Sequence, residues 1–463
     1  MNFLVSIPAF IIAIAVLVAI HEFGHYWVAR KMGVKVLRFS IGFGKPLWSR
    51  VAGKDQTEYV IAAIPLGGYV KMLDEREAPV EEHEKHRAFN RQSVWKRIAI
   101  VIAGPLFNFL LAIVLYSVVF VLGTNAMQPL IGEITPNSPA AMAQMPSNGK
   151  ILAINQQPVY SWNETRMAFL NAYLENKQQI TLKVESNDND AQDYQLNLSN
   201  TPLLKSSADF LEKAGIFAWR PQQVVSINRV LPDSSALAGG LQKNDVLLRV
   251  DDQAIHYTRK FIEYIQQHGK QKIVLLVKRN GQEIPLTLTL SEKTLKDKKV
   301  GSLGAELSSK IIDNLSESDQ QKVDSLFFVY QRNIAESFVL GVQKTWQMSV
   351  LTLKMMGRLV MGEASLKNIS GPVTIAEFAG KTALAGITVY LGFLAIISVS
   401  LGVLNLLPIP MLDGGHLLYY IIELLTGKPV SEAVQEVGFK IGIALVGSMM
   451  ILALYNDIVR LIN

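Results

Sequence analysis

Four long apolar runs dominate the hydropathy pattern of this 463-residue chain. They cover about residues 7–29, 98–122, 382–407 and 438–458. A helix needs roughly 20 mainly apolar residues to cross the hydrocarbon core of a bilayer, and each run meets that length. The pattern therefore predicts an α-helical polytopic membrane protein with four transmembrane helices.

The segment at 326–361 is amphipathic, because charged residues interrupt hydrophobic residues that recur with helical spacing. The hydrophobic positions are Phe338, Val342, Trp346, Val350 and Leu353, and the charged ones are Lys344, Lys354 and Arg358. This pattern is typical of helices that lie in the plane of the membrane surface. We therefore expect amphipathic interfacial helices within residues 310–380.

Between the second and third apolar runs lie about 200 more polar residues with a faint internal repeat. Each copy combines β-like alternation with one helix, at about residues 164–174 and 258–268. The second copy resembles a PDZ domain, whereas the first has Asn148-Gly149 where an acidic turn residue is usual. We predict two inserted α+β PDZ-like domains, at 126–221 and 222–309. Residues 1–125 and 381–463 then form the two parts of one membrane domain.

Two strand-like runs, at 59–64 and 69–72, follow the first apolar run. The link between them, residues 65–68, is rich in turn-forming residues. The pattern predicts a membrane-associated β-hairpin. Its open edge would have free backbone donors and acceptors that can pair with an extended peptide.

The loop at 30–97 is crowded with Lys and Arg, and the chain carries a net charge of +6. By the positive-inside rule this loop is cytoplasmic, so the N-terminus and the middle domains lie outside. Membrane topology therefore explains the charge better than nucleic acid does, and the expected partner is the lipid bilayer. The first run lacks a basic start and a small-residue cleavage site, which predicts a retained helix. The absence of Cys excludes disulfides, thiolate zinc sites and cysteine catalysis.

The first apolar run contains His21-Glu22-Phe23-Gly24-His25. Charged groups at mid-membrane cost on the order of 2.5–3.5 kcal/mol each, so this cluster indicates a function. Residues four apart share one face of a helix, which lets His21 and His25 bind one zinc ion. Glu22 lies about 100° around the helix from His21, beside the ligands, where it suits a general base.

A catalytic zinc site needs a third protein ligand. Val28 and Lys31 stand where the extended HExxHxxGxxH motif has Gly and His, so the ligand is not close by in sequence. Another polar constellation, residues 405–416, closes the third apolar run with two prolines that break the helix. Because the first and third spans run in the same direction, Asp413 comes to the depth of the histidines. We predict Asp413 as the third ligand, and His416 as a neighbour of the site or a plain loop residue.

The paired motifs resemble the site-2 protease family of intramembrane zinc proteases. The resemblance rests on HEFGH at 21–25, the NxxPxPxLDG pattern at 405–414 and the tandem PDZ-like domains, and it covers nearly the whole chain. It implies a Zn²⁺-dependent endopeptidase of the bacterial inner membrane with periplasmic PDZ domains. The implied substrates are transmembrane segments of single-pass proteins, namely an anti-sigma factor and remnant signal peptides.

The same resemblance implies roles for further residues. It implies that the substrate is contacted by Asn405, Pro408 and Pro410, and by Gly67, Gly68 and Tyr69 in a β element. Gly42-Phe43-Gly44 falls in a hairpin that dips into the membrane, and Gly104-Pro105 and Asn108 fall in the second span.

Two other functions stay open on the sequence. An HtpX-like membrane quality-control zinc protease would share the HExxH motif but would use a Glu as third ligand and digest exposed loops. A non-enzymatic PDZ membrane scaffold would keep the middle domains and need no zinc.

Overall fold

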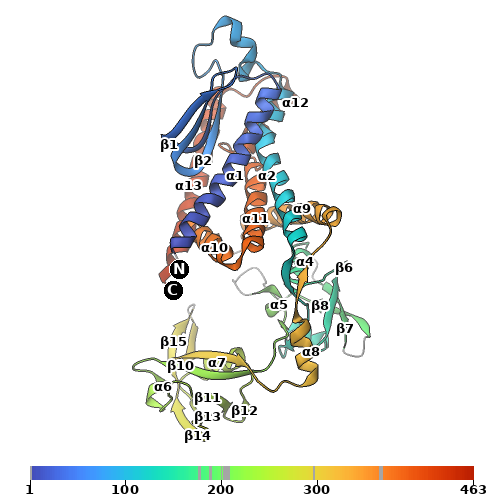
Figure 1. Cartoon of the computed structure of the whole chain (residues 1–463), viewed down its shortest axis with the longest axis vertical. Coiled ribbons are helices and arrows are strands. Elements are labelled where there is room, and N and C mark those ends of the chain that lie inside the picture. Colours follow the sequence, from blue (N-terminus) through green and yellow to red (C-terminus); the bar gives the residue numbers. More distant parts are fainter. Residues whose placement is uncertain are drawn as a thin grey trace.

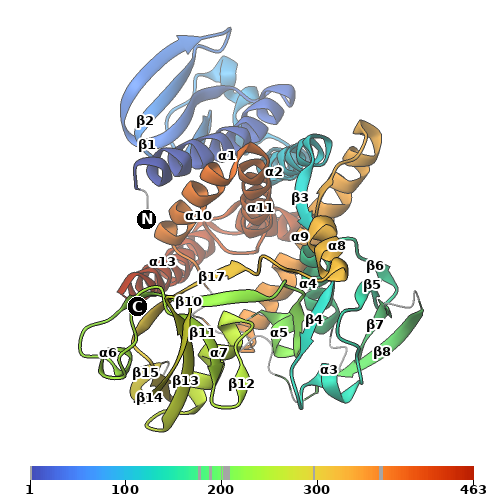
Figure 2. The same cartoon turned by 60° about the horizontal axis from the view of Figure 1, so that its bottom comes forward.

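The computed structural model describes residues 3–175, 179–186, 190–199, 201, 209–295, 298–363, 366 and 369–462. Long helices form one bundle, and two β-rich units extend from one end of it (Figure 1). Both chain ends lie close together at that same end. In the turned view of Figure 2 the two units stand side by side.

Four helices of the described residues are long and apolar enough to cross a membrane, as predicted. They are α1 (Phe3–Lys31), α2 (Val94–Leu122), α11 (Ile387–Asn405) and α13 (Glu432–Ile462). Buried apolar side chains join α1, α2 and α11, with Leu17 of α1 and Val399 of α11 almost fully enclosed. The bundle is therefore built around the helix that carries the HEFGH motif.

The third apolar run is not one helix, which corrects the predicted span at 382–407. A separate helix α10 (Pro372–Ala385) ends at Ala385, and α11 begins directly after Gly386. Gly386 has φ +117, a conformation that glycine adopts readily and that interrupts a helix. Helix α11 ends at Asn405, three residues before Pro408, which cannot continue the helical hydrogen bonds.

The amphipathic segment folds mainly into α9 (Ile334–Val360), which lies across the bundle (Figure 1). Ser337, Gly341 and Thr345, four residues apart, form its buried stripe, and Gly341 closely approaches α2. Phe338, Val342 and Trp346 are exposed on another face of this helix. Its position at the membrane interface stays a prediction. Preceding it are α8 (Glu317–Leu326) and β18 (Phe327–Tyr330), and β18 pairs with β3 (Thr124–Met127).

The loop after α1 forms a sheet from two long strands, β1 (Val36–Ala52) and β2 (Thr57–Met72), beside α1 (Figure 1). Residues 38–41 of β1 pair with two segments of β2, residues 58–61 and residues 68–71. A strand residue has one partner on each edge, so residues 38–41 lie between these two segments. The outer part of β1 pairs with residues 57–62 in turn. The short helices η1 (Glu82–Arg87) and η2 (Phe89–Arg91) complete the loop.

The predicted hairpin with its turn at 65–68 is therefore wrong. Both of its predicted arms belong to β2, and they flank β1 without pairing with each other. Residues 65–68 make an irregular bend inside β2, where the register shifts and Gly67 has φ +137. Bulges tolerate proline and glycine that a regular ladder would not, which is why turn-forming residues here do not end the strand.

Each outer unit combines a small sheet with one longer helix, as the repeat predicted. The first contains β4 (Ile131–Ile134), α3 (Pro139–Met142), β5 (Lys150–Ile154), β6 (Gln157–Pro158), α4 (Trp162–Leu174), β7 (Gln179–Glu185), β8 (Ala191–Asn197), α5 (Phe210–Lys213) and β9 (Ile216–Ala218). Its sheets have the orders β6-β5-β7-β8 and β4-β9, around a core that includes the fully buried Phe169.

The second unit has one larger sheet with the order β14-β13-β11-β10-β17. Its elements are β10 (Gln223–Val230), α6 (Ser235–Ala238), β11 (Val246–Val250), β12 (Gln253–Ala254), α7 (Thr258–Gln267), β13 (Lys272–Arg279), β14 (Gln282–Thr289), β15 (Ser291–Leu295), β16 (Lys298–Ser302) and β17 (Ala305–Ile311). Arg259 reaches the first unit, with Nη2 2.9 Å from Glu133 Oε2. The first unit in turn packs on α9 through Leu170, Leu174 and Leu351.

We predict that Gly341→Ala weakens the docking of α9 on α2. A Cβ at Gly341 would lie 2.5 Å from Ser117 Oγ and 2.8 Å from the Ile113 carbonyl oxygen. Overpacking of this kind costs about 1–3 kcal/mol, so the midpoint of thermal unfolding in detergent should fall. Gly357→Ala is the matched control, because nothing lies within 4 Å of its Cβ position. Equal midpoints for the two variants would contradict the predicted contact.

Candidate active site

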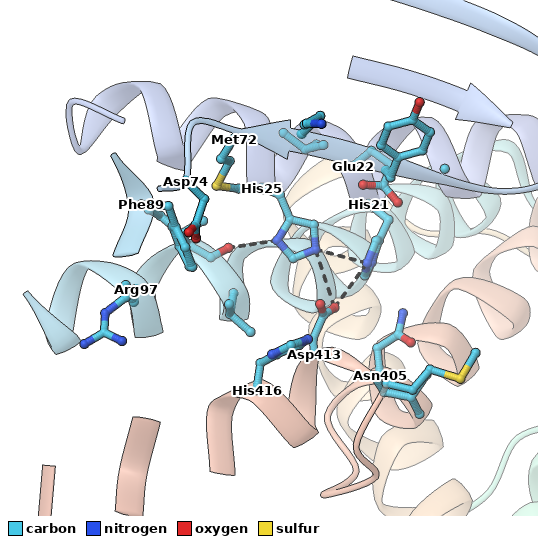
Figure 3. Close-up of a pocket in the computed structure, with 18 of the residues that line it drawn as sticks. His21, Glu22, His25, Met72, Asp74, Phe89, Arg97, Asn405, Asp413 and His416 are labelled. Carbon is cyan, nitrogen blue, oxygen red and sulfur yellow. Dashed lines mark hydrogen bonds and ion pairs between the residues drawn. The ribbon is translucent and has the colours of Figure 1, made fainter. Parts of the chain in front are cut away.

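Three predicted ligands meet in the bundle although they lie far apart in the sequence. His21 Nε2 and His25 Nε2 are 3.2 Å apart, across one turn of α1. Asp413 Oδ2 lies 3.2 Å from His21 Nε2 and 3.5 Å from His25 Nε2 (Figure 3). Among the described residues these are the ones whose ligand atoms are close enough to hold a metal ion together.

The hydrogen bonds around the cluster suit a metal cation. His25 Nδ1 lies 2.8 Å from the Ile100 carbonyl oxygen, which can only accept, so Nδ1 carries the hydrogen. In a neutral imidazole the other nitrogen, Nε2, then presents a lone pair. That lone pair faces the Asp413 carboxylate and the second imidazole, and convergent N and O lone pairs of this kind are a zinc donor set.

Glu22 lies beside the cluster and is not part of it. The residue is 8 % exposed and lines the same cavity as the histidines. Figure 3 shows it next to His21, on the side away from Asp413. Gly68 of β2 makes room for it, because a Cβ there would lie 2.8 Å from Glu22 Cγ.

The loop after α11 and two glycines position Asp413. Helix α12 (Asp413–Thr426) begins at this residue, and Met411 just before it has φ +103. A Cβ at Gly414 would lie 2.1 Å from the Leu407 carbonyl oxygen, and one at Gly415 would lie 2.5 Å from that of Ile409. The two glycines therefore let α12 start directly against its own loop. His416 lies one turn further along α12 and also lines the cavity.

Helix α2 supplies no predicted ligand, yet it forms the wall behind both histidines. Its Ile100 carbonyl accepts the His25 hydrogen bond, and Asn108 Nδ2 lies 3.1 Å from His21 Nδ1. A Cβ at Gly104 would lie 2.2 Å from His25 Nε2, so this position has no room for a side chain. The residues themselves gave one signal for this wall, an asparagine inside an apolar run.

The cavity of about 770 Å³ at this cluster is also lined by four of the residues with an expected substrate role. They are Asn405, Gly67, Gly68 and Tyr69. Pro408 and Pro410 are not among the described residues that line it. Pro410 instead lies against α13, where a Cβ at Gly442 would meet its carbonyl oxygen. The substrate role of the two prolines stays a prediction.

Ion pairs that the sequence did not reveal line the far end of the cavity. Arg97 Nη2 lies 2.6 Å from Glu423 Oε1, and both side chains are mostly buried. Arg76 donates two hydrogen bonds to Asp74, at 2.9 and 2.6 Å. Burial raises the pKa of Asp74, but these hydrogen bonds outweigh burial and hold it below its ordinary value. This end is therefore polar and charged. The Arg97–Glu423 pair joins residues far apart in the sequence, so no local pattern predicts it.

Two imidazoles and a glutamate on a membrane-crossing helix, with a carboxylate ligand candidate at the start of α12, are the features of a membrane-embedded metallopeptidase. The family model described as "Peptidase family M50" matches residues 9–449. The chain is 41% identical to the regulator of sigma-E protease RseP of Escherichia coli K12, over the full length of both. It is 40% identical to a putative zinc metalloprotease of Vibrio cholerae over 98% of both chains, and 40% identical to the regulator of sigma E protease of Haemophilus influenzae over the full length of both.

The chain belongs to peptidase family M50, the site-2 proteases. It is an intramembrane zinc metalloprotease, and its relatives and four apolar helices make it an inner-membrane protein. The resemblance drawn from the two motifs is thereby confirmed. Family membership also sets aside the scaffold and the HtpX-like protease.

We predict that Glu22→Gln abolishes cleavage but retains zinc, whereas His21→Ala and Asp413→Ala lose zinc as well. Loss of a general base typically costs about 10²–10⁴-fold in rate, while loss of a ligand removes the metal. Zinc per mole of purified protein and cleavage of a transmembrane peptide are the two measurements. Near-normal activity of Glu22→Gln would refute the role assigned to the glutamate.

Proposed function

We propose that the protease cuts a peptide bond inside the transmembrane segment of single-pass membrane proteins, with His21, His25 and Asp413 as zinc ligands. The observation that carries this is the convergence of three ligand atoms, all within 4.8 Å of one another, in a cavity that Glu22 also lines. Bound Zn²⁺ supplies a Lewis acid that activates water and polarises a carbonyl. Glu22 takes the proton from the water and passes it to the leaving nitrogen. Asn405 holds the substrate or its developing oxyanion.

The relatives named regulators of sigma-E protease support the substrates that we propose. We assign to this chain the membrane segment of an anti-sigma factor, cut after another protease has trimmed its outer domain, and remnant signal peptides. An intact helix hides its carbonyls in hydrogen bonds, so the segment must unwind before it is cut. The basic loop at 30–97 supports a cytoplasmic position for that loop and a periplasmic position for the two outer units.

The unwound substrate needs a partner for its backbone, and the inner segment of β2 offers one. Residues 68–72 line the cavity and pair with β1 on one edge, and within the described residues no strand pairs with their other edge. Strand addition at such an edge recognises main chain with little regard to side chains. That mode suits an enzyme whose substrates share instability of the helix more than sequence. Residues 59–61 have partners on both edges, so the open edge lies at residues 68–72 and not at the first predicted arm.

We predict that a proline scan over residues 69–71 reduces cleavage wherever the replaced N–H faces the cavity. Proline removes a donor, and a lost backbone hydrogen bond costs on the order of 1 kcal/mol, or about fivefold in rate. Proline at Trp48 or Val51, in the exposed outer part of β1, is the matched control. Zinc content should be normal throughout. Full activity across the scan would rule out strand addition here.

We further propose that the two PDZ-like units filter substrates by size. None of the predicted catalytic groups lies in them, and the first unit packs on the interfacial helix α9. The units begin and end at neighbouring points, because Met127 of β3 is the register partner of Phe327 of β18. A two-residue turn can therefore replace residues 128–326.

This deletion should leave hydrolysis of a short transmembrane peptide intact and make proteins with bulky outer domains cleavable. Cleavage of paired substrates, one trimmed and one with its outer domain, measures the effect in proteoliposomes. Zinc content checks that the membrane domain is folded. If the zinc-loaded deletion variant cannot cut the short peptide, the filter interpretation is wrong.

A further inference from the structure

One face of α2 lies against both histidines and contacts them through three residues. Ile100, Gly104 and Asn108 are spaced four residues apart, so they lie in one row along the helix. The Ile100 carbonyl oxygen accepts from His25, and Gly104 leaves room for the imidazole rings. The third member of the row, Asn108, contributes a side chain, and that side chain faces His21.

Asn108 is fully buried. Its amide lies next to the cluster, although Asn108 is neither a predicted zinc ligand nor the predicted general base. Its Nδ2 atom lies 3.1 Å from His21 Nδ1, and its Oδ1 atom is buried with no hydrogen-bond partner in the part of the chain that the structure describes. Burial of an asparagine in an apolar span costs free energy unless a hydrogen-bond partner offsets that cost. The neighbouring imidazole is that partner.

The hydrogen on His21 decides how the amide must point. A neutral imidazole that offers Nε2 to a metal carries its hydrogen on Nδ1, and this N–H needs an acceptor. The two ends of an amide have the same shape, and the hydrogen-bond network assigns them. Only Oδ1 of Asn108 can accept from Nδ1–H, so the amide turns its oxygen to His21 when Nε2 faces Asp413.

We propose that Asn108 is the positioning residue for His21, fixing the tautomer and the ring orientation that point Nε2 at the metal. This inference rests on the proposed ligand set of His21, His25 and Asp413. It gives the two histidines unequal support, because His25 is held by a backbone carbonyl that no substitution removes. His21 depends on a side chain, so its orientation can be lost by a single replacement.

Ser398 of α11 provides a control at the same turn of α2. Its hydroxyl donates to the Asn108 backbone carbonyl at 2.7 Å, and the residue is fully buried. Ser398→Ala therefore disturbs the contact between α2 and α11 without touching the amide that faces His21. A purely structural effect of Asn108 would be shared by this variant.

The experiment compares three full-length variants, Asn108→Leu, Asn108→Asp and Ser398→Ala, purified in detergent. The zinc dissociation constant comes from competition with a chromophoric chelator, and the visible spectrum of the Co²⁺-substituted protein reports ligand geometry. Loss of a hydrogen-bond partner of a metal-bound histidine typically costs about 10–100-fold in metal affinity. We expect that loss, with an altered Co²⁺ spectrum, for Asn108→Leu. Asn108→Asp keeps an acceptor and should stay within a few fold of the unsubstituted protein, as should Ser398→Ala.

Two results would overturn the inference. One is unchanged zinc affinity in Asn108→Leu, and the other is an equal loss in Asn108→Asp, which would mean that the amide donates. Equal losses in Asn108→Leu and Ser398→Ala would also overturn it, since they would show a packing effect. His21→Ala is measured alongside, because retention of zinc by that variant would refute the ligand set itself and not the role of Asn108.

Discussion

The cost of burying polar groups among membrane-crossing helices governs this structure. Two imidazoles and a carboxylate cannot lie there unpartnered, so each one must face another. The cluster of His21, His25 and Asp413 meets this requirement by convergence, with distances of 3.2 and 3.5 Å from the carboxylate to the two rings. Around it, α2 presents Gly104 without a side chain, and α12 starts tightly packed through its two glycines. The close approach of these helices is what brings donors from distant parts of the chain to one point.

A second constraint concerns backbone whose hydrogen-bonding groups are free to bind a peptide. Helices hide their hydrogen-bonding groups, so a protease inside a membrane must provide non-helical backbone beside its metal. The bent strands β1 and β2 are non-helical backbone at this place, because residues 38–41 pair with two segments of β2 and residues 68–72 line the cavity. The loop between α11 and α12 is the other irregular element at this depth, and α13 packs against it at Pro410.

The length and spacing of hydrophobic runs in the sequence predicted the helices of the structure. Apolar length predicted four crossing helices, and the spacing of Phe338, Val342 and Trp346 predicted the amphipathic α9. The strand pairing could not be read in this way, because proline and glycine at 65–68 make a bulge as readily as a turn. The interruption of the helix between α10 and α11 depends on one backbone angle, φ of Gly386. The wall of the site formed by α2 had one sign in the residues, Asn108 within an apolar run, because a backbone carbonyl and an absent side chain have no pattern in sequence.

The order of the ligands along the chain has a consequence for biosynthesis. His21 and His25 enter the membrane among the first residues made, while Asp413 follows about 400 residues later. At a translation rate of about 5–20 residues per second, roughly 20 to 80 seconds separate the two events. A nascent chain therefore lacks the predicted third ligand, Asp413, for nearly the whole of its synthesis. With the predicted ligand set, the zinc site is therefore complete only after the start of α12 has been made and has packed against α1.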